Sequence, residues 1–127
     1  MATFKRVTRY LFGTLFIGAG IGHFLIPQFF VDIVPPALPW PRTLVYLSGI
    51  AEMGLGALLF FRRWQTLAGW GLVALLIAVF PANLYMAQHP ERFPEIPKTA
   101  LLIRLPLQVV LIAWAYWYTR STGSVER

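Results

Sequence analysis

The sequence predicts an all-α integral membrane protein, a four-helix bundle with proline-rich outer loops. Of its 127 residues, 57% are hydrophobic, whereas soluble domains are typically about 45–50% apolar. The apolar residues fall into four blocks, each close to the roughly 20 residues that cross a bilayer as a helix. The segments between the blocks are too short for a soluble domain, so residues 1–127 are expected to form a single transmembrane domain.

The four expected helices span residues 10–26, 43–61, 66–86 and 99–118. The first block follows Lys5, Arg6 and Arg9 and could be mistaken for a signal peptide. Signal peptides end in small residues around a cleavage site. This block ends in the bulky stretch GHFLIPQFF, so we expect a retained helix.

Positive charge predicts the orientation of the helices. Basic residues precede the first block, Arg62 and Arg63 lie between the second and third, and Arg120 and Arg127 follow the fourth. In the two remaining loops, acidic residues offset the basic ones. The positive-inside rule therefore places both termini and the 62–63 turn in the cytoplasm. This distribution accounts for the net charge of +6 without a nucleic-acid partner.

Prolines dominate both outer loops, IPQFFVDIVPPALPWPR and AQHPERFPEIPK. Proline fixes φ and removes a hydrogen-bond donor, so we expect these loops to be stiff and non-helical and to cap the outer face. Within the first loop, PQFFVDIV is expected to lie at the interface as a short amphipathic segment. Pro81 and Pro106 lie inside helical blocks, where they free the carbonyls of Ile77 and Leu102.

Every block contributes polar side chains to the outer half of the predicted bundle. We take these as the candidate ligand-binding residues: His23, Glu52, Asn83, Arg104 and Gln108. Glu52 is about ten residues from Arg42 and from Arg62, near the bilayer centre. Because a lipid-facing charge is costly, we expect Glu52 to point inward and to neutralise Arg104.

Small residues predict where helices approach one another. Ser48, Gly49 and Gly56 share a helix face with Glu52, which favours close contact with a neighbouring helix. Gly18 and Gly22 form a second pattern typical of helix contacts.

Two interpretations of the polar cluster remain open. It either forms a functional pocket or only holds the helices together, since buried ion pairs are weak evidence for stability. No catalytic residue follows from the sequence, and no metal site is expected, because His89, the second histidine, lies in a loop. The absence of cysteine excludes disulfides and thiol redox chemistry within this chain.

Four segments, GIGHFLIPQFFVDIVPP, SGIAEMGLGALLF, FPANLYMA and RLPLQ, together resemble the DoxX and DoxX-like (MauE/DoxX-type) family of small four-helix membrane proteins. The resemblance covers nearly the whole chain, and the five candidate site residues match the family's polar positions. It implies a bacterial inner-membrane protein linked to sulfur, thiol or quinone redox metabolism. The lack of cysteine argues against a direct dithiol role.

The expected function is that of a binding or accessory subunit whose pocket holds a small lipophilic molecule such as a quinone or a lipid. Besides the bilayer, a redox protein and a second copy of the chain are the candidate partners. One alternative is a membrane enzyme in which Glu52 or His23 transfers a proton on a hydrophobic substrate. The other is a small transporter, which is disfavoured because one short polar cluster offers no continuous pathway across the membrane.

Overall fold

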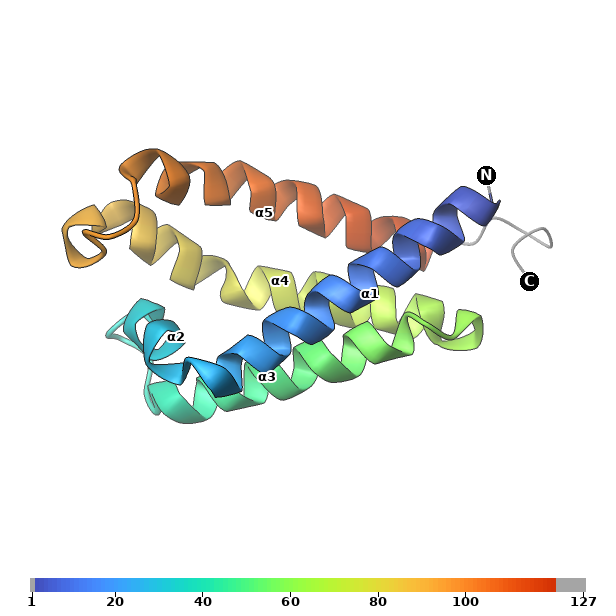
Figure 1. Cartoon of the computed structure of the whole chain (residues 1–127), viewed down its shortest axis with the longest axis horizontal. Helices are drawn as coiled ribbons and strands as arrows, with labels where there is room; N and C mark the ends of the chain where they lie inside the picture. Colours follow the sequence, from blue (N-terminus) through green and yellow to red (C-terminus); the bar gives the residue numbers. More distant parts are fainter. Residues whose placement is uncertain (1, 121–127) are drawn as a thin grey trace.

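A computed structural model describes residues 2–120, and over this range the chain is all-α, without strands (Figure 1). The helices are α1 (Ala2–Leu25), α2 (Pro27–Ile33), α3 (Pro41–Leu58), α4 (Gln65–Gln88) and α5 (Lys98–Thr119), with short 3₁₀ turns η1 (Arg62–Trp64) and η2 (Pro90–Arg92) on either side of α4.

Within the described range, two helical stretches are long and apolar enough to cross a membrane. These are Arg62–Gln88, which joins η1 to α4, and α5 (Lys98–Thr119). Helices α1 and α2 meet the same criterion only as a pair, bent by 96° where they join. The 18-residue α3 carries Arg42 and Glu52 and is not among these stretches. The prediction of helices able to span a membrane is therefore confirmed for α4 and α5.

The first helix begins earlier than predicted, at Ala2 rather than at residue 10. Lys5 and Arg9 lie within it and are buried. Lys5 Nζ donates a hydrogen bond to the carbonyl of Arg120 at 2.8 Å, and Arg9 donates to the carbonyl of Leu59. These carbonyls lie at the C-terminal ends of α5 and α3, where backbone acceptors lack helical partners and the helix dipole attracts cations.

The first outer loop is not wholly non-helical, so that part of the prediction is wrong. Residues 27–33 form α2, and within this loop only Ile26 and residues 34–40 lie outside a helix. Pro27 begins α2 and Pro41 begins α3. At the first helical position the missing N–H of proline costs nothing, because that donor has no partner within the helix. The prolines here start helices as well as ending them.

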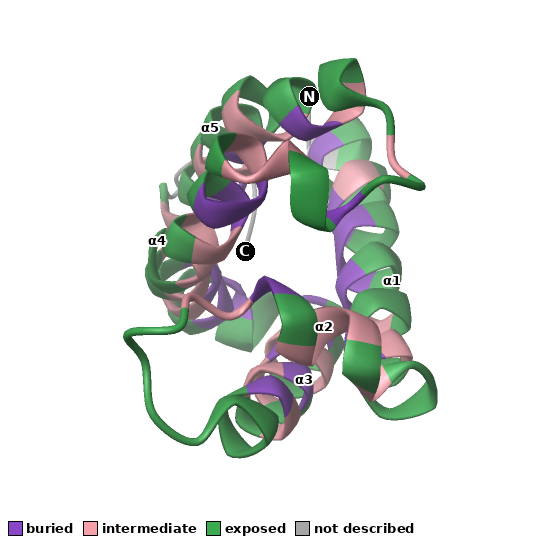
Figure 2. Cartoon of the chain, turned by 90° about the vertical axis from the view of Figure 1, so that its left-hand side faces the viewer, coloured by how far each residue is buried: buried purple, intermediate pink, exposed green. Residues whose placement is uncertain are grey.

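The long helices form two antiparallel pairs, α1 with α3 and α4 with α5 (Figure 1). The pairs meet at the end that holds the N-terminus and η1, and they diverge at the end that holds α2 and η2 (Figure 1). A buried cluster that includes Phe12, Leu59, Leu72 and Tyr118 fills the closed end. At the other end the two pairs stand apart, with α2 close to α3 (Figure 2).

Glycines bring α1 and α3 into backbone contact. A Cβ built on Gly13 would lie 2.6 Å from the carbonyl oxygen of Gly56, and one on Gly20 would lie 2.6 Å from that of Gly49. The predicted contact face of α3 is thus confirmed. The prediction for Gly18 is wrong, because a Cβ there meets nothing within 4 Å. A Cβ at Gly22 would lie 4.0 Å from the ring of Phe30 in α2, which is an ordinary van der Waals contact and not a close helix approach.

Candidate functional site

A cavity of about 640 Å³ occupies the space between the two helix pairs. This volume is within the range of about 300–1,000 Å³ that is typical of small-molecule sites. Its lining is apolar except for six side chains: His23, Ser48, Glu52, Asn83, Arg104 and Gln108. The structure therefore places all five candidate residues, together with Ser48, around one cavity.

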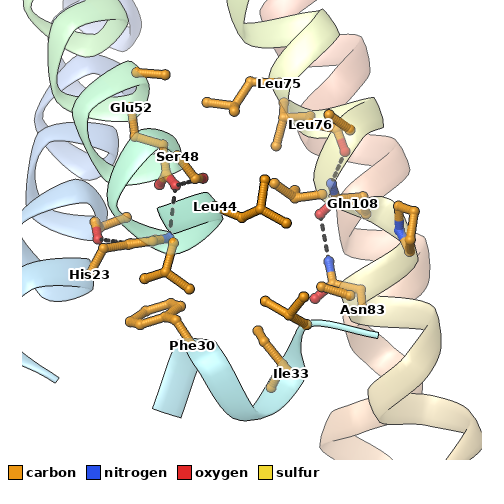
Figure 3. A pocket seen from close by; sticks show the side chains of 18 of the residues that line it. His23, Phe30, Ile33, Leu44, Ser48, Glu52, Leu75, Leu76, Asn83 and Gln108 are labelled. Carbon is orange, nitrogen blue, oxygen red and sulfur yellow. Dashed lines mark hydrogen bonds and ion pairs between the residues drawn. The ribbon is translucent and has the colours of Figure 1, made fainter. Parts of the chain in front are cut away.

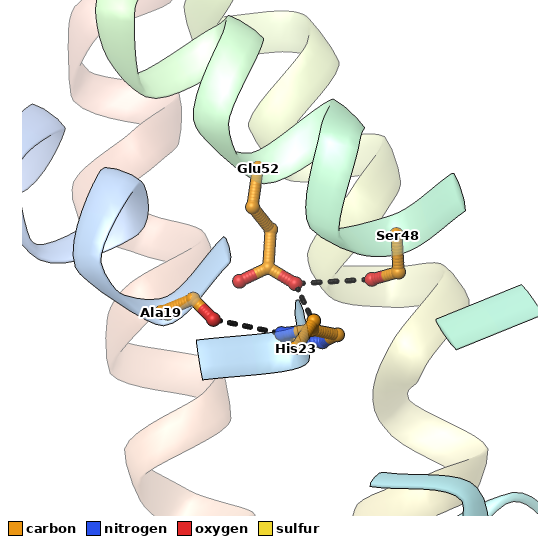
Figure 4. A network of polar contacts seen from close by, with 4 residues as sticks. All are labelled: Ala19, His23, Ser48 and Glu52. Carbon is orange, nitrogen blue, oxygen red and sulfur yellow. Dashed lines mark hydrogen bonds and ion pairs between the residues drawn. The ribbon is translucent and has the colours of Figure 1, made fainter. Parts of the chain in front are cut away.

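The α1–α3 wall carries a buried ion pair (Figure 4). His23 Nε2 lies 3.1 Å from Glu52 Oε2, and Ser48 Oγ donates to the same oxygen at 3.0 Å. The other ring nitrogen, Nδ1, lies 2.7 Å from the carbonyl oxygen of Ala19. The histidine ring also stacks on Phe30 of α2, with the ring centroids 3.8 Å apart. These contacts leave the imidazole little freedom to turn.

The hydrogen-bond pattern limits where the protons of this pair can be. The carbonyl of Ala19 can only accept, so His23 Nδ1 carries a proton and donates it. Two lone pairs facing each other at 3.1 Å would repel, so a further proton lies between His23 Nε2 and Glu52 Oε2. The pair is either imidazolium with carboxylate or imidazole with carboxylic acid, and in both states its net charge is zero. Among the described residues, Glu52 Oε1 has no hydrogen-bond partner.

A chain of amide hydrogen bonds crosses the α4–α5 wall. Arg104 Nε donates to Asn83 Oδ1 at 3.2 Å, and Asn83 Nδ2 donates to Gln108 Oε1 at 2.8 Å. Gln108 Nε2 in turn donates to the carbonyl of Leu76 (Figure 3). This carbonyl precedes by one residue the one expected to be freed by Pro81, that of Ile77. Asn83 and Gln108 are both buried, so these hydrogen bonds hold Nε of the Arg104 guanidinium in a fixed position.

The predicted ion pair between Glu52 and Arg104 is wrong. In the described part of the chain, His23–Glu52 is the only ion pair, and no carboxylate lies within ion-pair distance of Arg104. Glu52 and the amide chain that holds Arg104 face each other from opposite walls of the cavity (Figure 3). The reason is helix pairing: α3 packs along α1, which brings Glu52 to His23, whereas Arg104 belongs to the other pair.

The sequence predicted that the outer loops cap the outer face, but it named none of the loop residues that line the cavity. Phe30 and Ile33 of α2, followed by Val34, Pro35 and Leu38, line the cavity at its open end. The amphipathic spacing of PQFFVDIV is the signal that could have found them, since it predicts an apolar face in need of a partner. The described residues contain no group of three or more His, Asp and Glu side chains that could hold a metal ion.

A family model matches the chain over residues 12–119, and its description is "Domain of unknown function (DUF8561)". The chain belongs to this family. Every residue that lines the cavity falls within the matched region. Searches among curated proteins and among solved structures found no significant match.

Proposed function

We propose that this DUF8561 protein is a DoxX-like, multi-pass protein of the bacterial inner membrane that binds a small lipophilic molecule in the cavity between its helix pairs. It acts as a binding or accessory subunit in redox metabolism. The observation that carries the binding role is an apolar cavity into which all four long helices direct polar side chains. The assignment to redox metabolism rests on the resemblance to DoxX-like proteins.

Exposed apolar side chains support a position in the bilayer. On α5 they include Ile103, Val109 and Val110, each more than half exposed, and on α4 they include Leu67 and Ile77. Such faces are unfavourable in water and match the hydrocarbon of a membrane. In the proposed bundle α3 is the fourth span, because its polar residue Glu52 faces the cavity while its glycines pack against α1.

The two walls offer different contacts to a bound molecule. Its apolar body lies against side chains such as Phe16, Leu75 and Leu111. Its polar group can reach the terminal nitrogens of Arg104 on one wall or Glu52 Oε1 on the other. Gln108 was expected to bind the ligand, but both ends of its amide are bonded within the protein. In this proposal Gln108 holds the wall in position instead.

Native mass spectrometry of protein extracted without delipidation tests this function. Wild-type protein should carry a small lipophilic molecule, with a quinone and a lipid as the candidates. Ala51→Phe places a large side chain on the cavity wall and should abolish retention, whereas Ala57→Phe, on the exposed face of the same helix, should not. A wild-type protein without any bound molecule, or equal retention by both variants, would contradict a binding role.

A second candidate function is acid–base catalysis on a bound apolar substrate. The observation that favours it is the 3.1 Å contact between His23 Nε2 and Glu52 Oε2, beside an oxygen, Glu52 Oε1, that has no partner in the described chain. A proton shared across this contact is placed for transfer to a substrate in the cavity. An enzyme should carry substrate and product in the wild type but only substrate in Glu52→Gln. A binding protein should carry the same molecule in both.

A further inference from the structure

We infer that the occupant of the cavity is an anionic amphiphile, with one negatively charged headgroup held by Arg104 and an apolar chain between the helix pairs. This inference rests on the proposed binding function and narrows its ligand class. A neutral molecule such as a quinone would fill the apolar space but would leave the charge of Arg104 unbalanced.

The charges around the cavity do not sum to zero. Three side chains of its lining are ionisable: His23, Glu52 and Arg104. The His23–Glu52 pair is neutral in either of its protonation states, because one proton is shared between its two facing atoms. Arg104 therefore leaves the site with one uncompensated positive charge. Arg104 is half-buried, and charges withdrawn from water are normally paired. The occupant can therefore supply the anion that the lining lacks.

The hydrogen bonds of Arg104 point to the same ligand class. A guanidinium has one N–H on Nε and two on each terminal nitrogen. Nε donates to Asn83, whereas Nη1 and Nη2 have no partner among the described residues. These two nitrogens form the fork that binds carboxylate and phosphate oxygens in a bidentate manner. The donors available are thus those suited to an anionic headgroup.

The protein holds this fork in position without neutralising it. Asn83 accepts from Arg104, Gln108 accepts from Asn83, and the carbonyl of Leu76 accepts from Gln108. All three acceptors are uncharged, so the chain orients the guanidinium and leaves its charge in place. Arg104 lies six residues after Lys98, about 9 Å along the helix axis. The bond to buried Asn83 turns its side chain toward the cavity rather than along the helix toward the outer surface.

Matched pairs of probes test the inference on full-length protein in a neutral detergent, with affinities measured by native mass spectrometry. Palmitate is compared with methyl palmitate, and phosphatidylglycerol with diacylglycerol of the same chains. A ubiquinone analogue serves as a neutral apolar probe. We expect the wild type to bind the anion of at least one pair about tenfold or more tightly than its matched partner, as charge-assisted hydrogen bonds require.

Variants assign that preference to Arg104. Arg104→Met should abolish it, and Arg104→Lys should retain part of it, because lysine keeps the charge but not the fork. Arg42→Gln removes an exposed cation that does not line the cavity and should leave the preference unchanged. Should Arg104→Met fail to fold, the wild-type probe pairs and Arg104→Lys still decide.

The outcomes separate this inference from the function on which it rests. A preference for palmitate identifies a free acid as the source of the anion, and a preference for phosphatidylglycerol identifies a lipid phosphate. Equal affinities within both pairs, or an unchanged preference in Arg104→Met, would overturn the inference. Binding of methyl palmitate or the ubiquinone analogue would then leave the proposed function standing. Failure of every probe to bind would contradict both the inference and the proposed function.

Discussion

At the residue scale, His23 is the side chain on which the α1–α3 wall depends. It contacts the carbonyl of Ala19, the carboxyl group of Glu52 and the ring of Phe30, so it links three helices. Its partner Glu52 is buried, and within residues 2–120 Ser48 is the one further side chain that bonds to it. Removal of either member of the pair leaves the polar group of the other without a hydrogen-bond partner in an apolar environment.

A double-mutant cycle can therefore distinguish the observed pairing from the one expected from the sequence. His23→Leu should lower the free energy of unfolding by about 3–5 kcal/mol, because it strands a buried carboxyl group. Glu52→Leu in the His23→Leu background should restore part of this loss, with a coupling of about 1–3 kcal/mol. Chemical unfolding in detergent is the measurement.

The control for this cycle combines Glu52→Leu with Arg104→Met. These residues share no hydrogen-bond partner, so their effects should add to within about 0.5 kcal/mol. Strong coupling between Glu52 and Arg104, with none between Glu52 and His23, would show that the pairing described above is wrong.

The amide chain of the opposite wall gives a second prediction at this scale. Gln108→Leu should lower the free energy of unfolding by about 1–3 kcal/mol, because Asn83 loses its acceptor and the carbonyl of Leu76 loses a donor. Gln88→Leu, at an exposed position near the end of α4, should change it by less than about 0.5 kcal/mol. Similar losses of stability in both variants would argue against this series of hydrogen bonds. Chemical unfolding in detergent again measures the difference.

At the scale of elements, the closeness of α1 and α3 determines what His23 can reach. Gly13 faces Gly56 and Gly20 faces Gly49, so the two helices touch at points seven residues apart on each. The Cβ that a residue at position 49 would carry lies 2.8 Å from the Cβ of His23. The same glycine contact that joins the helices thus brings His23 next to the face that carries Glu52.

Alanine substitutions should separate the contacting glycines from the free ones. In Gly20→Ala the new Cβ overlaps the carbonyl of Gly49, and overpacking of this kind costs about 1–3 kcal/mol. In Gly18→Ala the new methyl group meets open space, so the higher helix propensity of alanine should stabilise the protein by about 0.5–1 kcal/mol. Thermal unfolding in detergent should show opposite signs for the two variants, and equal signs would contradict this helix packing.

At the scale of the whole molecule, one end is closed and the other holds the cavity. Lys5 and Arg9 bond to carbonyls at the C-terminal ends of α5 and α3. Tyr118 donates to Thr8 at 3.0 Å, which joins α5 to α1. Lys5 and Tyr118 therefore join the two helix pairs, whereas Arg9 joins α1 to α3 within one pair. Both cations also count as cytoplasmic markers in the topology argument. At the opposite end, where the cavity lies, the two pairs are connected through α2, because Ile33 packs in a buried cluster with Tyr85, Met86 and Leu101.

The proposed orientation predicts the outcome of a reporter assay. A reporter enzyme that is active only in the periplasm should be silent when fused after Arg120, since the excess of basic residues places that end in the cytoplasm. The same reporter inserted beside Pro36, in the linker between α2 and α3, should be active. The opposite pattern would reverse the orientation and place the cavity in the cytoplasmic half of the bilayer.

The sequence by itself determined the helical class, the approximate extent of the four long helices and the identity of five of the six polar residues around the cavity. Each of these follows from local chemistry: an unbroken apolar block forms a helix, and a polar side chain within such a block has to be turned away from lipid. The face of α3 that contacts another helix could also be predicted, because small residues at helical spacing indicate a close approach between helices.

Only the tertiary structure decided which polar groups meet. Charge alone favours Glu52 with Arg104, yet the glycine contacts place α3 beside α1, so that Glu52 pairs with His23. Lys5 and Arg9 are compatible with solvent until the carbonyl groups at the ends of other helices come within reach. Pro27 is compatible with a loop until α2 folds across the open end. Glu52, Lys5 and Arg9 each bond to a partner distant in sequence. Hydrophobic spacing carries no information on which helices become neighbours.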